Sequence, residues 1–158
     1  MPDSWVGKVV SLHVTEKAKA PMTTVKEVRV VQGKGLEGDR YFSQIGTFSS
    51  KPGSGRDATF IELEAIEALE RELKIKLEPK DSRRNIVTIG VPLNHLVGKT
   101  FKVGDVSFLG ERLCEPCSHL ENLTVTGVKD GLIHRGGLRT KILCDGMIRV
   151  GDSVQPER

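Results

Sequence analysis

Aromatic side chains are scarce in this sequence: they make up 4% of its 158 residues, against 37% for all apolar types. A packed core must therefore be built mainly from Val, Ile, Leu and Ala. Long apolar runs are missing as well, and none approaches the ~18–20 residues of a membrane helix. Without such a run we expect no membrane as partner. Residues 1–6 have neither a basic region nor a long apolar one, so we do not expect secretion.

Two further shortages concern charge and cysteine. The 24 basic and 21 acidic residues leave a net charge of +3, which is too small and too dispersed to indicate nucleic acid as a partner. Three cysteines are poor material for a disulfide framework, so we expect reduced thiols in a cytoplasmic protein. The length fits one domain, for which about 100–200 residues is usual, and no linker divides residues 1–158.

Glycine, by contrast, is plentiful, and most of the 17 glycines lie beside short β-branched runs. Apolar alternation predicts strands at 7–14, 25–31, 86–89, 100–103, 106–109, 138–144 and 147–150. Gly104-Asp105, Asp145-Gly146 and Gly151-Asp152 predict turns, and the Asp-Gly pair favours a tight type I′ hairpin. The sequence therefore predicts a mainly β protein: a closed or nearly closed β-barrel of short strands with a few small helices.

One amphipathic helix is predicted over residues 62–74, where Leu63, Ile66, Leu69 and Leu73 recur at helical spacing with glutamates on the other face. Shorter helices are predicted at 118–123 and 128–134. Residues 43–57, rich in Gly, Ser and Thr, are typical of a mobile loop.

The segment Gly35-Leu-Glu-Gly-Asp-Arg40 is a first candidate for ligand binding. Two glycines allow a backbone to approach a ligand closely, with Asp39 and Arg40 at the rim of the turn. The guanidinium of Arg40 suits a phosphate or carboxylate. The alternative is a surface turn with a local ion pair.

A second candidate is Ser82-Arg-Arg-Asn85, directly before the predicted strand 86–89. In an extended chain Arg83 and Arg84 point to opposite faces, so one of them can face inward. An inward arginine needs an anionic partner, because an unpaired buried charge is unfavourable. The alternative is a solvated basic turn.

The segment 133–139 is a third candidate, since His134, Arg135 and Arg139 surround a Gly-Gly turn that suits an anion. A lone histidine is more often structural than catalytic, so His134 is the weaker candidate among them.

The segment Cys114-Glu-Pro-Cys117 allows three interpretations. It is a dithiol redox pair, half of a zinc site completed by His119, His134 or Cys144, or the carrier of one thiolate that acts as nucleophile or soft-metal ligand. Pro116 biases the segment toward an extended conformation, in which side chains three apart face opposite sides. The chain leaves the predicted strand after Pro116, and strand ends at the mouth of a barrel are where ligands usually bind. We therefore predict Cys117 as the functional thiol and Cys114 as its partly buried support.

Taken in order, these motifs resemble the MOSC domain, named for the C-terminal domain of molybdenum cofactor sulfurase. The resemblance runs from about residue 7 to 154. The matching stretches are Gly35-Leu-Glu-Gly-Asp-Arg40, Arg83-Arg-Asn-Ile-Val-Thr-Ile-Gly-Val-Pro-Leu-Asn94, Leu96-Val-Gly98, Phe101-Lys-Val-Gly-Asp105, Cys114-Glu-Pro-Cys117 and Gly146-Met-Ile-Arg-Val-Gly-Asp152. The chain is similar to the small standalone bacterial form. Tyr41 stands where relatives often have histidine.

The resemblance implies a β-barrel that binds the molybdenum cofactor in its molybdopterin form, with pyridoxal phosphate binding as a further association of the family. It implies that Cys117 ligates molybdenum or carries sulfur, with Cys114 as the less certain second thiol. Groups suited to the anionic cofactor are Asp39, Arg40, Arg83, Arg84, Asn85, His134, Arg135 and Arg139.

Three functions follow from the resemblance. The first is a reductase of N-hydroxylated small molecules that takes electrons from a separate protein, since the sequence has no flavin, haem or iron–sulfur motif. The second is a sulfur carrier that receives sulfur from a cysteine desulfurase as a persulfide on the thiol. The third is a binding module that holds the cofactor without chemistry.

Overall fold

The computed structural model describes residues 4–17, 20–39, 57–114, 124 and 126–157. Its strands are β1 (Gly7–Val14), β2 (Thr23–Val25), β3 (Glu27–Val31), β4 (Gly35–Leu36), β5 (Ala58–Glu62), β6 (Ile86–Ile89), β7 (Thr100–Val103), β8 (Val106–Leu113), β9 (Leu138–Ile142), β10 (Gly146–Arg149) and β11 (Ser153–Pro156). Its helices are α1 (Leu63–Leu73), α3 (Val128–Gly131) and two 3₁₀ turns, η1 (Pro79–Ser82) and η2 (Leu93–Leu96).

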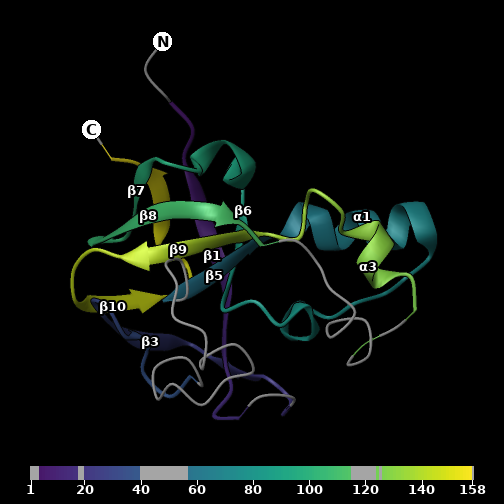
Figure 1. The fold of residues 1–158 in the computed structure, drawn as a ribbon, viewed down its shortest axis with the longest axis horizontal. Coiled ribbons are helices and arrows are strands. Elements are labelled where there is room, and N and C mark those ends of the chain that lie inside the picture. Colours follow the sequence, from purple (N-terminus) through teal and green to yellow (C-terminus); the bar gives the residue numbers. More distant parts are fainter. Residues whose placement is uncertain (1–3, 18–19, 40–56, 115–123, 125, 158) are drawn as a thin grey trace.

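Seven of the strands in these described ranges close into a barrel, in the order β11-β7-β8-β9-β5-β6-β1. The barrel closes where β1 pairs with β11, with Gly7 opposite Val154. Every neighbouring pair is antiparallel except β5 and β6, which are parallel and are connected through α1. Figure 1 shows α1 and α3 together on one flank of the barrel. The expected closed barrel with small helices is confirmed.

Three of the seven aromatic residues lie together inside the barrel. Phe60, Phe101 and Phe108 are fully buried, and their ring centroids lie 5.2 to 5.9 Å apart. The rest of this core is aliphatic, as the composition predicts. The small sheet β10-β3-β4 adds Val28, Val30 and Ile148 to the same core, so it packs against the barrel rather than standing apart.

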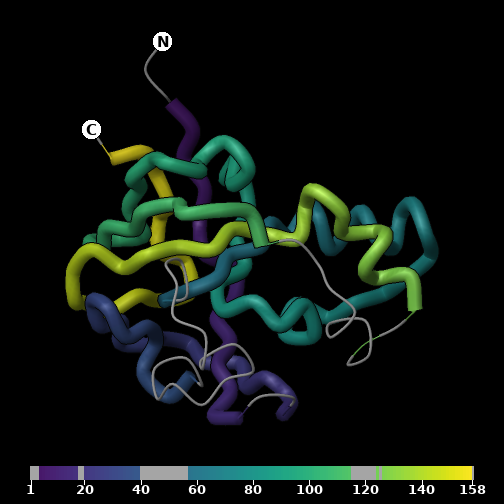
Figure 2. The backbone as a smooth tube through the Cα atoms, viewed as in Figure 1, coloured from purple at the N-terminus to yellow at the C-terminus, as the bar shows by residue number. Residues whose placement is uncertain are grey.

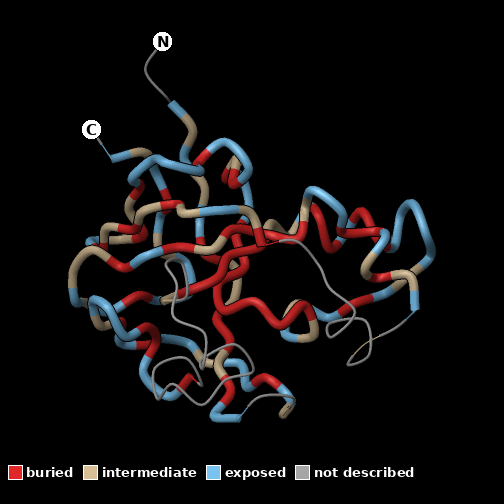
Figure 3. The backbone as a smooth tube through the Cα atoms, viewed as in Figure 1, coloured by how far each residue is buried: buried red, intermediate tan, exposed pale blue. Residues whose placement is uncertain are grey.

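A second apolar cluster lies outside the barrel, between its wall and α1. Ile61 and Val87 point outward from β5 and β6 and meet Ile66 and Leu69 of the helix. Figure 3 shows the buried face of α1 turned toward the strands. The predicted helix 62–74 is confirmed as α1, because its apolar spacing matched a real interface.

Other predictions need correction. The predicted strand 25–31 is split into β2 and β3, the segment 106–109 extends to Leu113, and the helix 128–134 is only one turn, α3. The predicted hairpin at Asp145-Gly146 is wrong: Gly146 begins β10, which pairs with β3 and not with β9. Ile148 is fully buried, and its burial in the core draws β10 to β3. The predicted helix 118–123 and all but the last residue of the loop 43–57 lie outside the described residues.

A close backbone crossing yields the first prediction. Gly110 of β8 passes directly under the end of η2, so a Cβ at this position would lie 2.0 Å from the carbonyl oxygen of Leu96. We expect Gly110→Ala to lower the free energy of unfolding by about 3 kcal/mol, because backbone atoms cannot rotate away from the clash.

Gly33→Ala is the matched control, because a Cβ there meets no atom within 4 Å and only its positive φ of 75° is unfavourable. That variant should lose roughly 1 kcal/mol. Urea unfolding measures both, and equal losses would contradict the close crossing at Gly110.

Candidate functional site

A row of polar side chains crosses the outer wall of the barrel. Arg112 on β8 lies opposite Arg139 on β9, and Arg139 lies opposite Thr59 on β5. The row continues through Asn85, just before β6, to His13 on β1. We call these five residues the polar row. Strand neighbours point to opposite faces, and the neighbours of the polar row belong to the core or pack against it: Leu113, Leu138, Phe60, Ile86 and Leu12.

Asn85, between Thr59 and His13 in the polar row, joins three strands. Its fully buried amide oxygen accepts hydrogen bonds from the backbone N–H of Thr59 at 3.1 Å and from the Thr59 hydroxyl at 3.2 Å. Its Nδ2 donates to the carbonyl oxygen of His13 at 3.1 Å. Because β6 begins only at Ile86, the Asn85 side chain extends the pairing of β5, β6 and β1 by one step. The structure thus shows a structural role for Asn85, and its role toward a cofactor stays a prediction.

Arg84 connects this region to the end of β8. Its side chain keeps only 8% of its surface exposed; Nε donates to the carbonyl oxygen of Gly136 at 2.8 Å and Nη2 to that of Cys114 at 3.2 Å. The turn that contains Gly136 and Gly137 can lie close to β5 because Gly137 has no side chain. A Cβ there would lie 2.0 Å from the carbonyl oxygen of Phe60. Within the described residues no carboxylate pairs with Arg84, so a buried positive charge is balanced by backbone dipoles alone.

Cys114 directly follows β8 and is itself buried, with 2% of its surface exposed. Its backbone N–H donates to the carbonyl oxygen of Gly137 at 2.7 Å, which fixes the point from which the chain continues. Cys117, Arg40 and Tyr41 lie outside the described residues, so their roles stay predictions.

The zinc interpretation gains no support from the described part of the chain, where no three His, Cys, Asp or Glu side chains gather closely enough to hold a metal. Cys144 lies beyond the other end of β9, and its sulfur accepts a hydrogen bond from the N–H of Ser107 at 3.4 Å.

Asp39 and Arg83 lie on the far side of the polar row, beside the chain that follows β1. Asp39 is buried and accepts a hydrogen bond from the N–H of Thr15 at 3.0 Å, and Arg83 donates to the carbonyl oxygen of Ala20. Next to both lies an open pocket of about 380 Å³, lined by Val14, Thr15, Glu16, Lys17, Ala20, Thr23 and Gly38. The predicted residues therefore brace the lining of this pocket.

Arg135 and His134 are placed differently from the other predicted residues. Arg135 reaches the C-terminal end of α1, where Nη2 lies 3.0 Å from a carboxylate oxygen of Glu72. The hydrogen bond from Arg135, and to a smaller extent the one from Arg71, lowers the pKa of the Glu72 carboxyl below its usual value. His134 is exposed at a positive φ of 64°. Arg135 thus braces the turn that holds Gly136 rather than facing Arg84.

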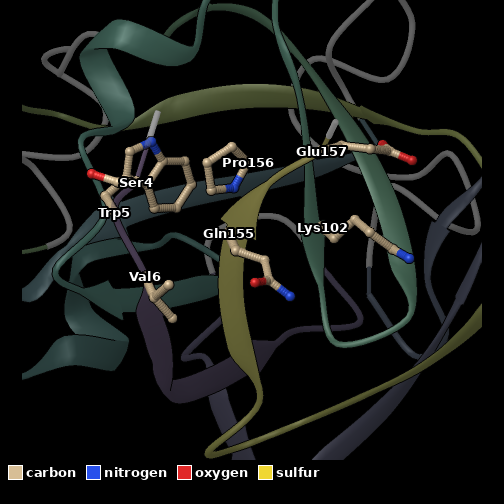
Figure 4. A pocket seen from close by; sticks show the side chains of 7 residues that line it. All are labelled: Ser4, Trp5, Val6, Lys102, Gln155, Pro156 and Glu157. Carbon is tan, nitrogen blue, oxygen red and sulfur yellow. The ribbon is translucent and has the colours of Figure 1, made fainter. Parts of the chain in front are cut away.

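A second pocket, of about 340 Å³, lies near the two ends of the described chain, which Figure 2 shows on one side of the molecule. Figure 4 shows Trp5 and Lys102 on opposite sides of β11 in this pocket. None of the residues predicted for a site lines it: the lining is Ser4, Trp5, Val6, Lys102, Gln155, Pro156 and Glu157.

Three members of the polar row, Arg112, Thr59 and His13, were not among the residues predicted from the sequence. Thr59 and His13 point away from the barrel core and are nevertheless buried, with 5% and 2% of their surfaces exposed. Only the register across neighbouring strands brings them together. A polar residue in an otherwise apolar strand was the one available signal.

The fold defines a mainly β protein built on a closed seven-stranded barrel. The family model of the MOSC domain matches residues 51–155, more than half of the sequence, and the chain belongs to this family. The family is linked to molybdenum cofactor binding. A comparison with curated proteins finds no match. Within the described residues no helix is long and apolar enough to cross a membrane.

Several solved structures share the fold. The YuaD protein of Bacillus subtilis has 15% sequence identity and a TM-score of 0.78, and the match covers 98% of this chain and 100% of that one. YiiM of Geobacillus stearothermophilus has 16% identity and a TM-score of 0.73 over 96% of this chain and 75% of its own. YiiM of Escherichia coli has 16% identity and a TM-score of 0.67 over 96% and 70%.

The polar row yields a prediction on pH. Burial lowers the pKa of His13 from 6.5 to about 4, against a smaller opposing effect of Asp81. The unfolded chain therefore binds a proton between pH 6.5 and 4 that the folded chain does not. The contribution of neutral His13 to the free energy of unfolding should be fully present above pH 6.5. It should decrease as the pH drops toward 4, with a slope of at most about 1.4 kcal/mol per pH unit.

Urea unfolding at pH 7.5, 6 and 5 tests this, and His13→Gln should show a shallower loss than the wild type. His95→Gln, at an exposed histidine of η2, is the control. An unchanged slope in His13→Gln would show that other groups set the acid sensitivity.

Proposed function

We propose that the protein binds the molybdenum cofactor in its molybdopterin form and reduces N-hydroxylated small molecules, with the Cys117 thiol as ligand of the metal. Membership of the MOSC family supports the cofactor. The observation that carries the proposal is Arg84, whose buried charge has backbone carbonyls as its only partners among the described residues. A phosphate-bearing, multiply anionic cofactor is the type of ligand that such a charge favours.

The residues around Arg84 fit such a group. The guanidinium is held from one side by Gly136 and Cys114, which fixes its orientation. Gly137 lets the turn pack directly against the carbonyl group of Phe60, which brings the carbonyl oxygen of Gly136 within reach of Arg84. A thiolate is the ligand that a soft metal prefers, and Cys117, three residues after Cys114 in the sequence, is the thiol we propose for this role. When bound, the molybdenum centre would supply two-electron redox chemistry, with electrons delivered by a separate protein.

The backbone of Cys114 is held in place on both sides, three residues before Cys117. Its N–H and its carbonyl oxygen are both hydrogen-bonded, to Gly137 and Arg84 respectively, so the chain leaves β8 from a fixed point. Covalent geometry keeps the Cα of Cys117 within about 11 Å of that of Cys114. That limit on chain length is compatible with a cofactor that contacts both the proposed thiol and Arg84.

The role of Arg84 can be measured as molybdenum content. In protein made by a host that produces the cofactor, Arg84→Gln should retain about tenfold less molybdenum per chain than the wild type, since it loses charge-assisted hydrogen bonds. Arg84→Lys keeps the charge but not the fork, so it should give an intermediate value. Arg71→Gln, at an exposed arginine of α1, is the control.

Thermal unfolding of the same variants separates folding from binding. If Arg84→Lys folds like the wild type and retains wild-type molybdenum content, the arginine fork has no part in holding the cofactor.

The three cysteines can be distinguished by substitution. Cys117→Ser should abolish both molybdenum content and turnover of a hydroxylamine-type base. Cys114→Ser should keep much of both, because the hydrogen bonds at this position come from its backbone. Cys144→Ser, at the other end of β9, is the matched control and should behave like the wild type. Elemental analysis and a reduction assay with an artificial electron donor provide the two measurements.

Other outcomes select the alternatives. A persulfide on Cys117 after incubation with a cysteine desulfurase, without turnover of loaded protein, would identify a sulfur carrier instead. Equal and complete loss in Cys114→Ser and Cys117→Ser would indicate a dithiol or zinc site.

A further inference from the structure

Two arginines face each other on the outer wall of the barrel, at one end of the polar row. Arg112 lies directly opposite Arg139 across the antiparallel β8–β9 pair. The next pair is Leu113 and Leu138, and Leu138 is fully buried in the barrel core. Because adjacent side chains alternate between faces, Arg112 and Arg139 both point away from the core. Arg139 is partly exposed and Arg112 exposed, so ligands from solvent can reach the pair.

A β-bulge creates this juxtaposition. The register shifts between Gly110 and Arg112, so that Gly110 lies opposite Thr140 and Arg112 opposite Arg139. An unbroken ladder would place Glu111 opposite Arg139 instead, and opposite charges across strands are favourable. The bulge replaces that attraction with a repulsion between two guanidinium groups. Bulges commonly re-aim a side chain at a functional site.

Neither arginine is neutralised by an acid within the described residues. The ion pairs there involve Arg71, Arg135 and Arg149. The carboxylate of Glu111 lies near Asp57 on another part of the wall, where it raises the pKa of the Asp57 carboxyl in addition to the larger effect of burial. Two adjacent cations without a partner anion are unfavourable unless a ligand supplies the negative charge.

The geometry points to a phosphate-binding site formed by Arg112 and Arg139. Two planar forks side by side match the oxygens of one phosphate group, each able to donate two hydrogen bonds. Thr59 is the next residue of the polar row and Cys114 follows two positions after Arg112, so a phosphate here would lie beside the proposed site. The phosphate can belong to a phosphorylated substrate or to the cofactor.

Inorganic phosphate is the probe, and cofactor-free full-length protein is the sample. Phosphate should raise the unfolding temperature of the wild type in a saturable way, while sodium chloride at matched ionic strength should not. Calorimetric titration should show phosphate binding weakened at least about tenfold in Arg112→Gln and in Arg139→Gln. Arg29→Gln, at an exposed arginine of β3, removes the same charge elsewhere and should bind phosphate like the wild type.

The bulge gives the experiment a second signature, which a merely structural role would not produce. In low salt without phosphate, Arg112→Gln should unfold at a higher temperature than the wild type, because the repulsion is gone. Arg112→Glu should unfold at a higher temperature still and should not bind phosphate, because it pairs with Arg139. The proposal would be overturned if phosphate and chloride changed the unfolding temperature equally. It would also be overturned if Arg112→Gln, Arg139→Gln and Arg112→Glu bound phosphate like the wild type.

Loading with cofactor distinguishes the two sources of phosphate. If the loaded protein no longer binds inorganic phosphate, the pair holds the phosphate of the cofactor. If binding persists, the pair serves a phosphorylated substrate. The measurements on cofactor-free protein do not depend on the proposed redox function, so either proposal can fail while the other stands.

Discussion

The buried charge of Arg84 is the constraint on which the arrangement of the site depends. A guanidinium with 8% of its surface exposed must direct its donors at nearby acceptors, because an unpaired buried charge is strongly unfavourable. The acceptors are the carbonyl oxygens of Gly136 and Cys114. One side chain therefore ties the start of β6 to the end of β8 and to the turn before β9. That turn approaches closely enough only because Gly137 lacks a side chain.

Polar groups on the wall of this barrel are organised by strand register. Asn85 replaces a missing step of backbone pairing between β5 and β6, and its bond to the carbonyl of His13 holds β1 in line. A one-residue shift in strand pairing would turn the side chains of the polar row into the core. Burial of the neighbouring apolar side chains therefore also fixes the register of the polar row. The bulge in β8 changes this register locally, and it alone decides that Arg112 rather than Glu111 meets Arg139.

The sequence predicted correctly the elements in which burial of one face produces a periodic pattern of apolar residues. These are most of the barrel strands and α1, whose apolar spacing follows its contact face. β5 was missed because its run leads into α1 without a turn signal. The partners of Arg84 were beyond prediction, since backbone acceptors at Gly136 and Cys114 leave no mark in the side-chain sequence. Arg135 carried the right chemistry for an anion, but its anion is Glu72 of the same chain, a pairing that only the packing of α3 and α1 reveals.

The seam between β1 and β11 has a consequence for how the chain folds. Gly7 and Val154 are neighbours in space but lie near opposite ends of the described sequence, so the contact closes a very long loop. Until β11 has been synthesised, β1 presents an unpaired edge there, and the core around Phe60, Phe101 and Phe108 has an open side. A barrel with such non-local pairing is expected to fold slowly, with its last step concentrated at one seam. During that interval, chaperones or a second nascent chain would meet an exposed strand edge.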